Sequence, residues 1–344
     1  LIETHLQLNI QALGTLKLSA KIIIGRLFRV LFSSSVFKDF NVVLMYHRVA
    51  PVLPKIDQDL FVTTASLENH IRELSTFFDI VSLDNIDSSH TRNKNKCAIT
   101  FDDGWLDNYK YAYPIIMKYK IPATIFIPVA NIGLDRGFWF DDLFELARIS
   151  ETKASFGEFV SCFKSLVLTW NPCGTPSRQL KDLISKMKLV DARQVDRIVD
   201  EGFRRLGQSR VLKRSLINWS EAMEMGKNNI AFGSHGLRHY ILTNVDQITK
   251  AIEICESLKI LRQQRVSMSP FFSYPNGNFD DEAVHLVARA GYLGGVTTKI
   301  GYNNKDANPY LLNRIPIHEY VGHTTSLLWF RIFQAYIAGN SSTF

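Results

Sequence analysis

Thr100-Phe101-Asp102-Asp103-Gly104 ends an apolar run that begins at Cys97. Adjacent side chains of a strand point to opposite faces, so both carboxylates reach one site only if the strand ends there. Gly104 permits the turn that this requires. Two ionised carboxylates so close repel each other, and a divalent cation bound by one of them removes the conflict. The alternative is an ordinary Asp-Gly turn with solvated carboxylates.

A second polar string, Ser234-His235-Gly236-Leu237-Arg238-His239, follows another apolar run. A spacing of four residues puts His235 and His239 on one face if this turn is helical. One Asp and two His would hold a metal and leave the other Asp as a base, which is a complete set for metal-assisted hydrolysis. Zinc is the favoured ion, and Co²⁺, Ni²⁺, Fe²⁺ and Mn²⁺ also suit these donors. The alternative is a helix start with two chance histidines.

Apolar runs alternate with helical patterns along the chain, which predicts an α/β fold with parallel strands. A barrel is favoured over an open sheet because no Gly-rich nucleotide loop follows the first strand. Barrel sites lie at the carboxyl ends of the strands. The predicted strands are 42–46, 80–83, 96–101, 123–128, 230–233, 271–274, 293–297 and 312–317.

Three further segments complete the expected organisation. Residues 37–325 form the barrel domain, interrupted at about 138–215 by a helical insertion without a convincing strand. Residues 326–344 hold an aromatic-rich helix that we expect to pack on the barrel. Residues 1–36 form a basic amphipathic helix, and two roles stay open for it: lying on anionic lipid, or packing on the domain or on a partner. Its apolar stripe is Leu16, Ala20, Ile23, Leu27 and Leu31.

Composition bounds the class of protein. The chain has 344 residues, 46% of them hydrophobic and 21% charged, which predicts a globular protein. A net charge of +7 favours contact with an anionic membrane surface or an acidic glycan. The sequence has no recognisable nucleic-acid-binding motif, so we expect no nucleic-acid partner. It has no apolar run long enough to span a bilayer and no clear signal peptide, so we expect a cytoplasmic or peripheral membrane location.

Thr100–Gly104 together with His235-x-x-x-His239 resembles the polysaccharide deacetylase family, which shares the NodB homology domain. The likeness extends from Val43–Val49 to Arg314–Ile317 and includes Phe272–Gly277. The string Tyr46-His47-Arg48-Val49 and the Ser-Tyr-Pro-Asn-Gly string are most similar to members associated with exopolysaccharide or surface-glycan biosynthesis.

The resemblance implies a distorted (β/α) barrel of about seven strands that removes acetyl groups from N-acetylated sugars. Asp103, His235 and His239 would hold the metal, and Asp102 would be the general base. The backbone N–H of Asn276 would stabilise the oxyanion. The residues alone suggest the same chemistry, because a metal lowers the pKa of bound water and a carboxylate then takes its proton.

The chain departs from the family pattern in three ways. Many members have Arg at the position of Ser273, where it orients the base, so either another cation, Arg48 or Arg314, does so here, or Asp102 is less well tuned. The aromatic residue often found at the position of Asn276 is missing. The family's downstream Asp-Trp motif is also missing. A late His often serves as the general acid, and His318 is the candidate, with His47 as its rival. Both histidines have a structural alternative, a surface loop for His318 and hydrogen bonding of strand ends for His47.

Trp139 and Tyr274 are candidates for stacking on a sugar ring, with burial in the core as the alternative. The leading function is removal of N-acetyl groups from N-acetylhexosamine units of a surface polysaccharide or a lipid-linked glycan precursor. Two alternatives remain open. One is an O-acetyl esterase or small-amide amidase at the same site, and the other is a catalytically silent glycan-binding protein.

Overall fold

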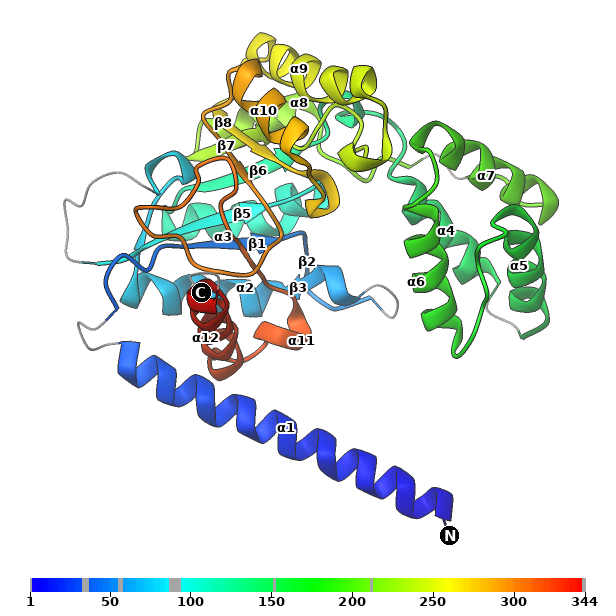
Figure 1. The fold of residues 1–344 in the computed structure, drawn as a ribbon, viewed down its shortest axis with the longest axis horizontal. Coiled ribbons are helices and arrows are strands. Elements are labelled where there is room, and N and C mark those ends of the chain that lie inside the picture. Colours follow the sequence, from blue (N-terminus) through cyan, green and yellow to red (C-terminus); the bar gives the residue numbers. More distant parts are fainter. Residues whose placement is uncertain are drawn as a thin grey trace.

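A computed structural model describes residues 2–32, 37–54, 58–86, 94–150, 153–210 and 213–341. Its centre is a parallel sheet in the order β10-β1-β5-β6-β7-β8-β9, with β4 beside β5 (Figure 1). The sheet curls, and one parallel bridge, Val296 to Leu312, links β9 to the segment before β10. The strands are β1 (Val42–Tyr46), β4 (Asp79–Ile80), β5 (Lys96–Phe101), β6 (Ala123–Ile127), β7 (Ile230–Ser234), β8 (Met268–Ser273), β9 (Gly294–Val296) and β10 (Ile315–Pro316). The predicted distorted (β/α) barrel is confirmed.

Every residue of β1, β5 and β6 is buried, as expected for parallel strands covered on both faces. Their register decides where the site forms. Tyr46 pairs with Phe101, and Ile127 pairs with Ser234, so neighbouring strands end at the same level. The residues that follow these strands therefore meet at one edge of the sheet. A small parallel pair, β2 (Arg48–Ala50) and β3 (Phe61–Thr63), lies beyond β1.

Helices cover the sheet as amphipathic elements. In α2, for example, Leu67, Ile71 and Leu74 recur at helical spacing and are fully buried in the main core. The covering helices are α2 (Thr64–Phe77), α3 (Tyr113–Tyr119), α8 (Trp219–Gly226), α9 (Gln247–Gln263), α10 (Asp281–Ala290), α11 (Glu319–Gly322) and α12 (Thr325–Ser341).

The segment predicted as an insertion folds into four helices beside the sheet (Figure 1). They pack around a core of their own, which includes Leu143, Phe163, Leu183 and Val199. Its described residues contain helices and no strand. The four helices are α4 (Trp139–Ile149), α5 (Lys153–Leu166), α6 (Pro176–Met187) and α7 (Ala192–Arg205).

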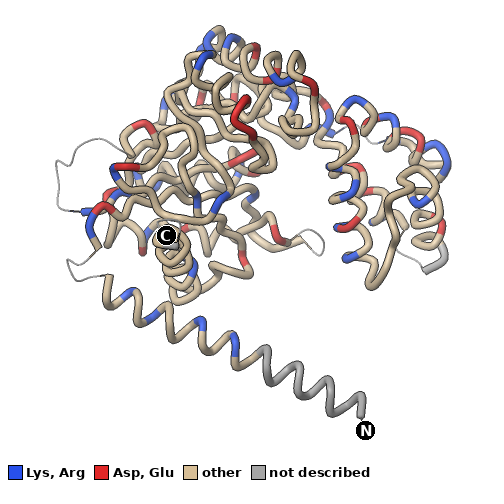
Figure 2. Tube along the Cα trace, viewed as in Figure 1, with Lys and Arg blue, Asp and Glu red and all other residues tan. Residues whose placement is uncertain are grey.

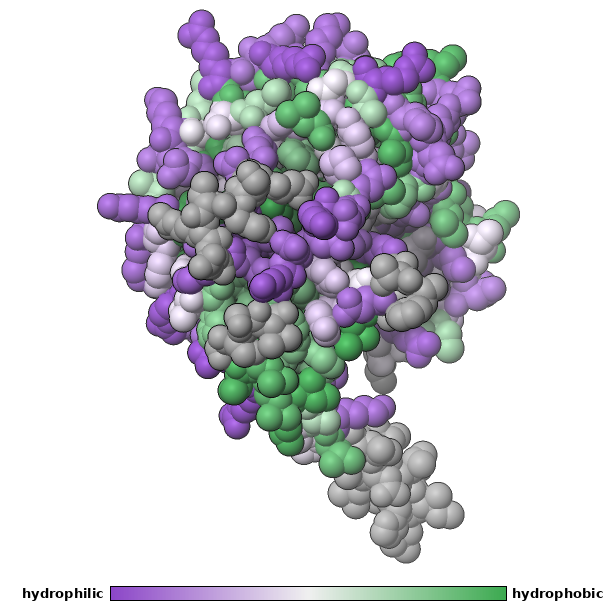
Figure 3. All heavy atoms as spheres, turned by 60° about the vertical axis from the view of Figure 1, so that its left-hand side comes forward, coloured by the Kyte–Doolittle hydropathy of each residue, from purple (hydrophilic) through white to green (hydrophobic). Residues whose placement is uncertain are grey.

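Helix α1 (Ile2–Phe32) packs against α12. The packed face is formed by Gly25, Phe28 and Phe32, and the ring of Phe32 lies 5.1 Å from that of Trp329. The apolar stripe noted in the sequence is on a different face, where Ile23 and four other large apolar side chains are more than half exposed. Figure 3 shows hydrophobic side chains gathered over the described part of α1. These exposed side chains are Leu16, Ile23, Leu27, Val30 and Leu31.

Within the described ranges, no helix is both long enough and apolar enough to cross a membrane.

Candidate active site

The two carboxylates lie at the end of β5, where the strand stops as predicted. Asp102 N–H continues the ladder by donating to the carbonyl of Tyr46 at 2.9 Å. Asp103 then adopts φ 75°, and Gly104 adopts φ 68°. A Cβ on Gly104 would lie 2.7 Å from the side chain of Ile127, so this turn requires glycine. Two successive left-handed residues bring both carboxylates to the same edge.

Asp102 is held by Arg314, a fully buried residue from the segment before β10. Arg314 Nη1 donates to Asp102 Oδ1 at 2.7 Å, and Nη2 donates to Oδ2 at 2.6 Å. Arg314 Nε is fixed by the carbonyl of Thr297 at 2.7 Å, and Nη2 also reaches Ser273 Oγ at 3.1 Å. This is a bidentate charge-assisted pair. Of the two arginines considered in the sequence analysis, Arg314 is therefore the one that pairs with Asp102.

The other candidate, Arg48, has a different role. Arg48 Nε pairs with Asp107 at 2.9 Å, and its guanidinium lies 4.1 Å from the ring centre of Trp105. Trp105 Nε1 in turn donates to Asp103 Oδ2 at 3.1 Å. Sequence reasoning missed Trp105, although it follows the Asp-Asp-Gly string directly.

The electrostatics keep both carboxylates ionised. Burial alone would raise the pKa of Asp102, but the charge of Arg314 and its hydrogen bonds outweigh burial and hold the pKa below its usual value. Burial opposes ionisation of Asp103 as well. Its hydrogen bond and attraction to His239 nevertheless lower the pKa of Asp103 well below the usual range. One edge of the sheet thus holds two buried anions at neutral pH.

His235 and His239 are carried by an irregular loop after β7, so the helical turn assumed in the sequence analysis is wrong. Gly236 has φ 79° and His239 has φ 66°, and these left-handed residues fold the loop back on itself. The two rings still meet, with centroids 4.7 Å apart. Loop geometry, rather than helical spacing, brings the two imidazoles together.

Glu253 on α9 fastens this loop. It is fully buried, and its Oε2 accepts from the N–H of Leu237 at 3.0 Å and of Arg238 at 2.8 Å. Burial outweighs these hydrogen bonds and raises the pKa of Glu253 above its usual value. Sequence reasoning missed Glu253 as well, because a lone Glu in a helical pattern gives no sign of burial.

His235 is oriented for ligation through Nε2. Its Nδ1 donates to the carbonyl of Ser273 at 2.7 Å, which leaves the Nε2 lone pair facing the carboxylates. Burial, together with the nearby His239, outweighs attraction to Asp102 and lowers the pKa of His235 to about 4. The ring is therefore neutral at pH 7, as a metal ligand must be.

Asp103, His235 and His239 fit a divalent metal. One ligand atom from each lies within 4.8 Å of the others. Asp103 Oδ1 is 3.2 Å from His239 Nε2 and 3.5 Å from His235 Nε2. An ionised carboxylate and two imidazoles with free positions beside them match catalytic metal sites.

The remaining predicted residues are placed as follows. Asn276 lies in a short 3₁₀ turn, η6 (Pro275–Gly277), after β8. His47 directly follows Tyr46, the last residue of β1, whose carbonyl accepts from the N–H of Asp102. His318 follows β10 and is half-buried, and its Nδ1 has no hydrogen-bond partner among the described residues. Burial outweighs the charge of Asp59 and lowers the pKa of His318.

The two aromatic candidates have different outcomes. Tyr274 is fully buried, and its hydroxyl donates to the carbonyl of Tyr310 at 3.1 Å. The predicted sugar contact of Tyr274 is therefore wrong, because its ring is part of the core. Trp139, at the start of α4, lines a pocket together with His239 and Asn276. This pocket has a volume of about 110 Å³ and lies between the barrel loops and the inserted helices.

The sequence of this chain is similar to those of known proteins. The model of a family described as polysaccharide deacetylase matches residues 89–139 and 191–295. A protein of Bacillus subtilis strain 168 with a polysaccharide deacetylase name, YxkH, is 22% identical over 280 residues, covering 80% of this chain and 70% of its own. Over residues 89–139 and 191–295, the chain is therefore similar to the polysaccharide deacetylase family.

Solved structures show the same fold. Streptococcus pyogenes deacetylase PplD in complex with acetate matches with a TM-score of 0.55 and 17% identity, covering 86% of this chain and 97% of that one. BC0361, a polysaccharide deacetylase from Bacillus cereus, matches with a TM-score of 0.56 and 18% identity, covering 85% of this chain and 69% of that one. IcaB from Ammonifex degensii matches with a TM-score of 0.53 and 16% identity, covering 86% of this chain and 98% of that one.

Proposed function

We propose that this protein is a metal-dependent hydrolase that removes N-acetyl groups from N-acetylhexosamine units of a surface polysaccharide or a lipid-linked glycan precursor. Similarity to this family supports a hydrolase acting on amide bonds of carbohydrate. The observation that carries the finer proposal is the buried pair of Asp102 and Arg314 beside the three potential ligands. It keeps one carboxylate ionised and free to act as a base next to a metal site.

Each residue then has a chemical task. A divalent ion bound by Asp103, His235 and His239 would supply Lewis acidity and an acidified water, and zinc suits these donors. Asp102 accepts the proton of the attacking water, and Arg314 holds its carboxylate in place. The backbone N–H of Asn276 donates to the oxygen of the acetamide as negative charge develops there.

The leaving amine needs a proton, and we assign its donor to His318. Its Nδ1 has no hydrogen-bond partner among the described residues and is therefore available to carry and donate a proton. His47 is the rival because it directly follows Tyr46, whose carbonyl accepts from the N–H of Asp102. Replacing each by Gln separates them, since loss of the general acid flattens the alkaline limb of the pH profile for kcat.

Acetate release from N-acetylated chito-oligosaccharides by metal-loaded protein tests the proposal. We expect turnover by the wild type, and a loss of about a hundredfold or more in Asp102→Asn and His239→Ala. Acetyl esters of the same sugars are assayed in parallel, because faster cleavage of esters would favour an esterase. Glycan binding without turnover under any divalent metal would contradict the proposal.

We also propose that the exposed face of α1 lies on an anionic bilayer. Residues 15–32 contain Lys17, Lys21, Arg26 and Arg29 and no acidic residue, as Figure 2 shows for the described part of α1. Five large apolar side chains on this helix are more than half exposed. A helix with apolar and basic surfaces of this kind suits the interface of an anionic membrane.

Vesicle co-sedimentation tests the membrane proposal. We expect binding to vesicles containing phosphatidylglycerol, weaker binding to neutral ones, and loss of binding in Leu27→Glu/Leu31→Glu. Leu168→Glu is the matched control, because Leu168 is 85% exposed on the inserted unit. If Leu27→Glu/Leu31→Glu leaves vesicle binding unchanged, this face of α1 is not the membrane-binding surface. If the protein self-associates and does not bind vesicles, the face instead contacts a second copy of the chain.

A further inference from the structure

The inserted helices form one wall of the catalytic pocket. The family model leaves residues 140–190 unmatched, yet part of this segment lines the pocket beside His239 and Asn276. Most of this wall therefore lies outside the residues that the family model matches. The residues of this wall include Trp139, Phe140, Met187, Lys188 and Val190.

Lys188 connects this wall to two loops of the barrel. It caps the carboxyl end of α6. Its Nζ donates to Asn276 Oδ1 at 2.7 Å, and its backbone carbonyl accepts from Asn244 Nδ2 at 2.6 Å. Asn244 ends the turn η5 (Leu242–Asn244) after β7, and Asn276 lies in the turn after β8. One residue of the insertion therefore bridges the loops that follow two neighbouring strands.

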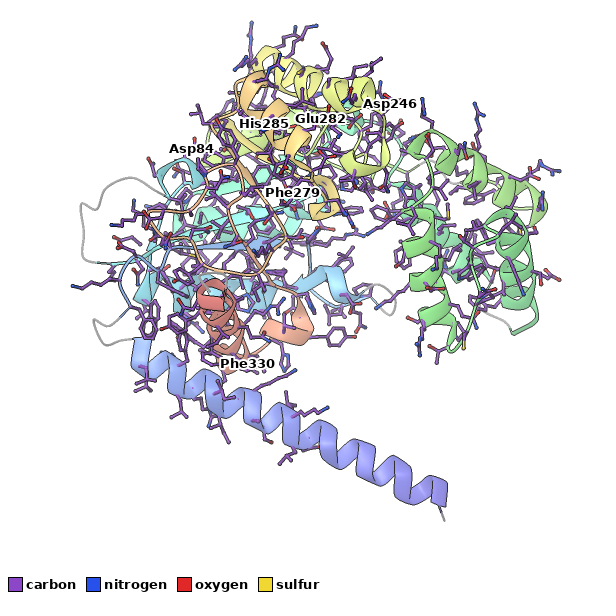
Figure 4. The ribbon with its side chains drawn as sticks, in the orientation of Figure 1. Asp84, Asp246, Phe279, Glu282, His285 and Phe330 are labelled. Atoms are coloured by element: carbon purple, nitrogen blue, oxygen red, sulfur yellow. The ribbon has the colours of Figure 1, made fainter. Side chains whose placement is uncertain are left out.

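Two ion pairs fasten the insertion at other points. Lys181 on α6 contacts Asp59, next to β3. Arg193 on α7 lies 3.6 Å from Asp246, which caps α9 and is labelled in Figure 4. Exposed ion pairs of this kind contribute little individually. The contact of Lys188 differs because it ends on a residue of the site.

The side chain of Asn276 has two hydrogen-bond partners, because its Oδ1 accepts from Lys188 and its Nδ2 donates to Asn278 Oδ1 at 2.6 Å. The backbone of Asn276 has φ 58° and ψ 3°, a left-handed conformation, and Gly277 beside it has φ 78°. An oxyanion donor works only if it is already aligned when charge develops on the acetamide oxygen. A hydrogen bond to the side chain of Asn276 limits the orientations that its peptide N–H adopts.

We infer that Lys188 is a positioning residue, which clamps the Asn276 loop to the inserted helices and so aligns the oxyanion donor. The inference rests on the proposed role of Asn276 in deacetylation. It also makes the inserted unit part of the catalytic apparatus.

Kinetics of three single variants test the clamp first. Lys188→Met should lower kcat about five- to twentyfold with KM within about twofold, because the donor is loosened rather than removed. Lys188→Arg should recover most of this loss. Lys186→Met is the control, since Lys186 lies on the same helix and does not line the pocket.

Asn276→Gly provides a double-mutant cycle. Glycine keeps the backbone N–H and tolerates the positive φ, but it removes the acceptor of Lys188. Adding Lys188→Met to Asn276→Gly should therefore cost less than about twofold. The inference would be overturned if Lys188→Met lowered kcat as much in the Asn276→Gly background as in the wild type. It would also be overturned if Lys188→Met and Lys186→Met had the same kcat.

Amide hydrogen exchange supplies a readout that does not need activity. Exchange in residues 274–279 should rise about fivefold or more in Lys188→Met and stay unchanged in Lys186→Met. If the wild type releases no acetate but Lys188→Met raises this exchange, the proposed function is rejected and the clamp is retained. If the wild type is active but Lys188→Met changes neither kcat nor exchange, only the clamp is rejected.

Discussion

Replacing Arg314 by Met removes the charge that faces Asp102 while keeping a side chain of similar length. The carboxylate would lose hydrogen bonds of 2.7 and 2.6 Å and keep only Ser273 Oγ at 3.4 Å. Both partners are buried, with Arg314 at 0% and Asp102 at 2% exposed. Water therefore cannot take over the role of the guanidinium.

The size of the effect follows from the chemistry of buried pairs. Removing one partner of a buried ion pair costs about 3–5 kcal/mol if the other stays ionised. Protonation of Asp102 relieves this cost, and losing an adjacent cation raises a carboxyl pKa by about 1–3 units. A base must be ionised to accept a proton, so activity is lost below its pKa. The acid limb of kcat/KM should therefore move upward by about 1–3 pH units.

The assay is acetate release between pH 5 and 9, with bound metal measured at each pH. Arg314→Lys should lie between the wild type and Arg314→Met, because it keeps the charge and loses the bidentate geometry. Arg48→Met is the control, since Arg48 pairs with Asp107 instead. A profile of Arg314→Met that superimposes on the wild type at equal metal content would refute the role assigned to the pair.

Three further predictions concern metal affinity and stability. Glu253→Ala should weaken metal affinity about ten- to a hundredfold by releasing the histidine loop, as isothermal titration measures. The metal-free protein should lose up to about 3 kcal/mol of stability as the pH falls from 6.5 to 4, because the unfolded chain protonates His235 before the folded one does. Denaturant unfolding at several pH values checks this, and His235→Asn should flatten the slope. Gly25→Leu should lower the melting temperature by several degrees, because a Cβ there would lie 1.9 Å from the carbonyl oxygen of Ser326 on α12. Leu27→Ala, on the exposed face, should leave the melting temperature within about one degree.

Local patterns were enough to predict the sheet and the edge that carries the site. Strands β1, β5 and β6 are continuous apolar runs because both of their faces are covered. Polar residues that directly follow such runs meet at one edge of the sheet. The sequence therefore predicted that Asp102, Asp103 and His235 lie close together, as they do in the structure. The chemistry of the donor set was therefore predictable from residue type and from position after a strand, whereas the helical spacing assumed for His235 and His239 was wrong.

The features that the sequence did not predict depend on contacts between distant segments. Arg314 lies 212 residues from Asp102, and two arginines were equally plausible partners until the fold placed them. Glu253 shapes the histidine loop from a separate helix. Tyr274 was predicted to contact sugar because the local sequence does not show whether a side chain at the end of a strand is buried by other segments.

The α1 helix illustrates the same limit. Its composition allowed either packing or membrane contact, and the sequence could not assign faces. The fold separates them, because Gly25 permits close approach to α12 and draws Phe28 and Phe32 inward. Phe330 of α12, labelled in Figure 4, lies next to this contact, with Lys21 Nζ 5.9 Å from its ring centre. The remaining apolar stripe is then left exposed.

The most direct test measures acetate release while metal-free protein is titrated with Zn²⁺. The rate should rise in proportion to added metal and level off at one equivalent. Asp102→Asn should bind the same equivalent and release almost no acetate. In the proposed mechanism, one bound metal ion and the neighbouring carboxylate of Asp102 act together in catalysis. Acetate release that is independent of metal, or full activity of metal-bound Asp102→Asn, would contradict this mechanism.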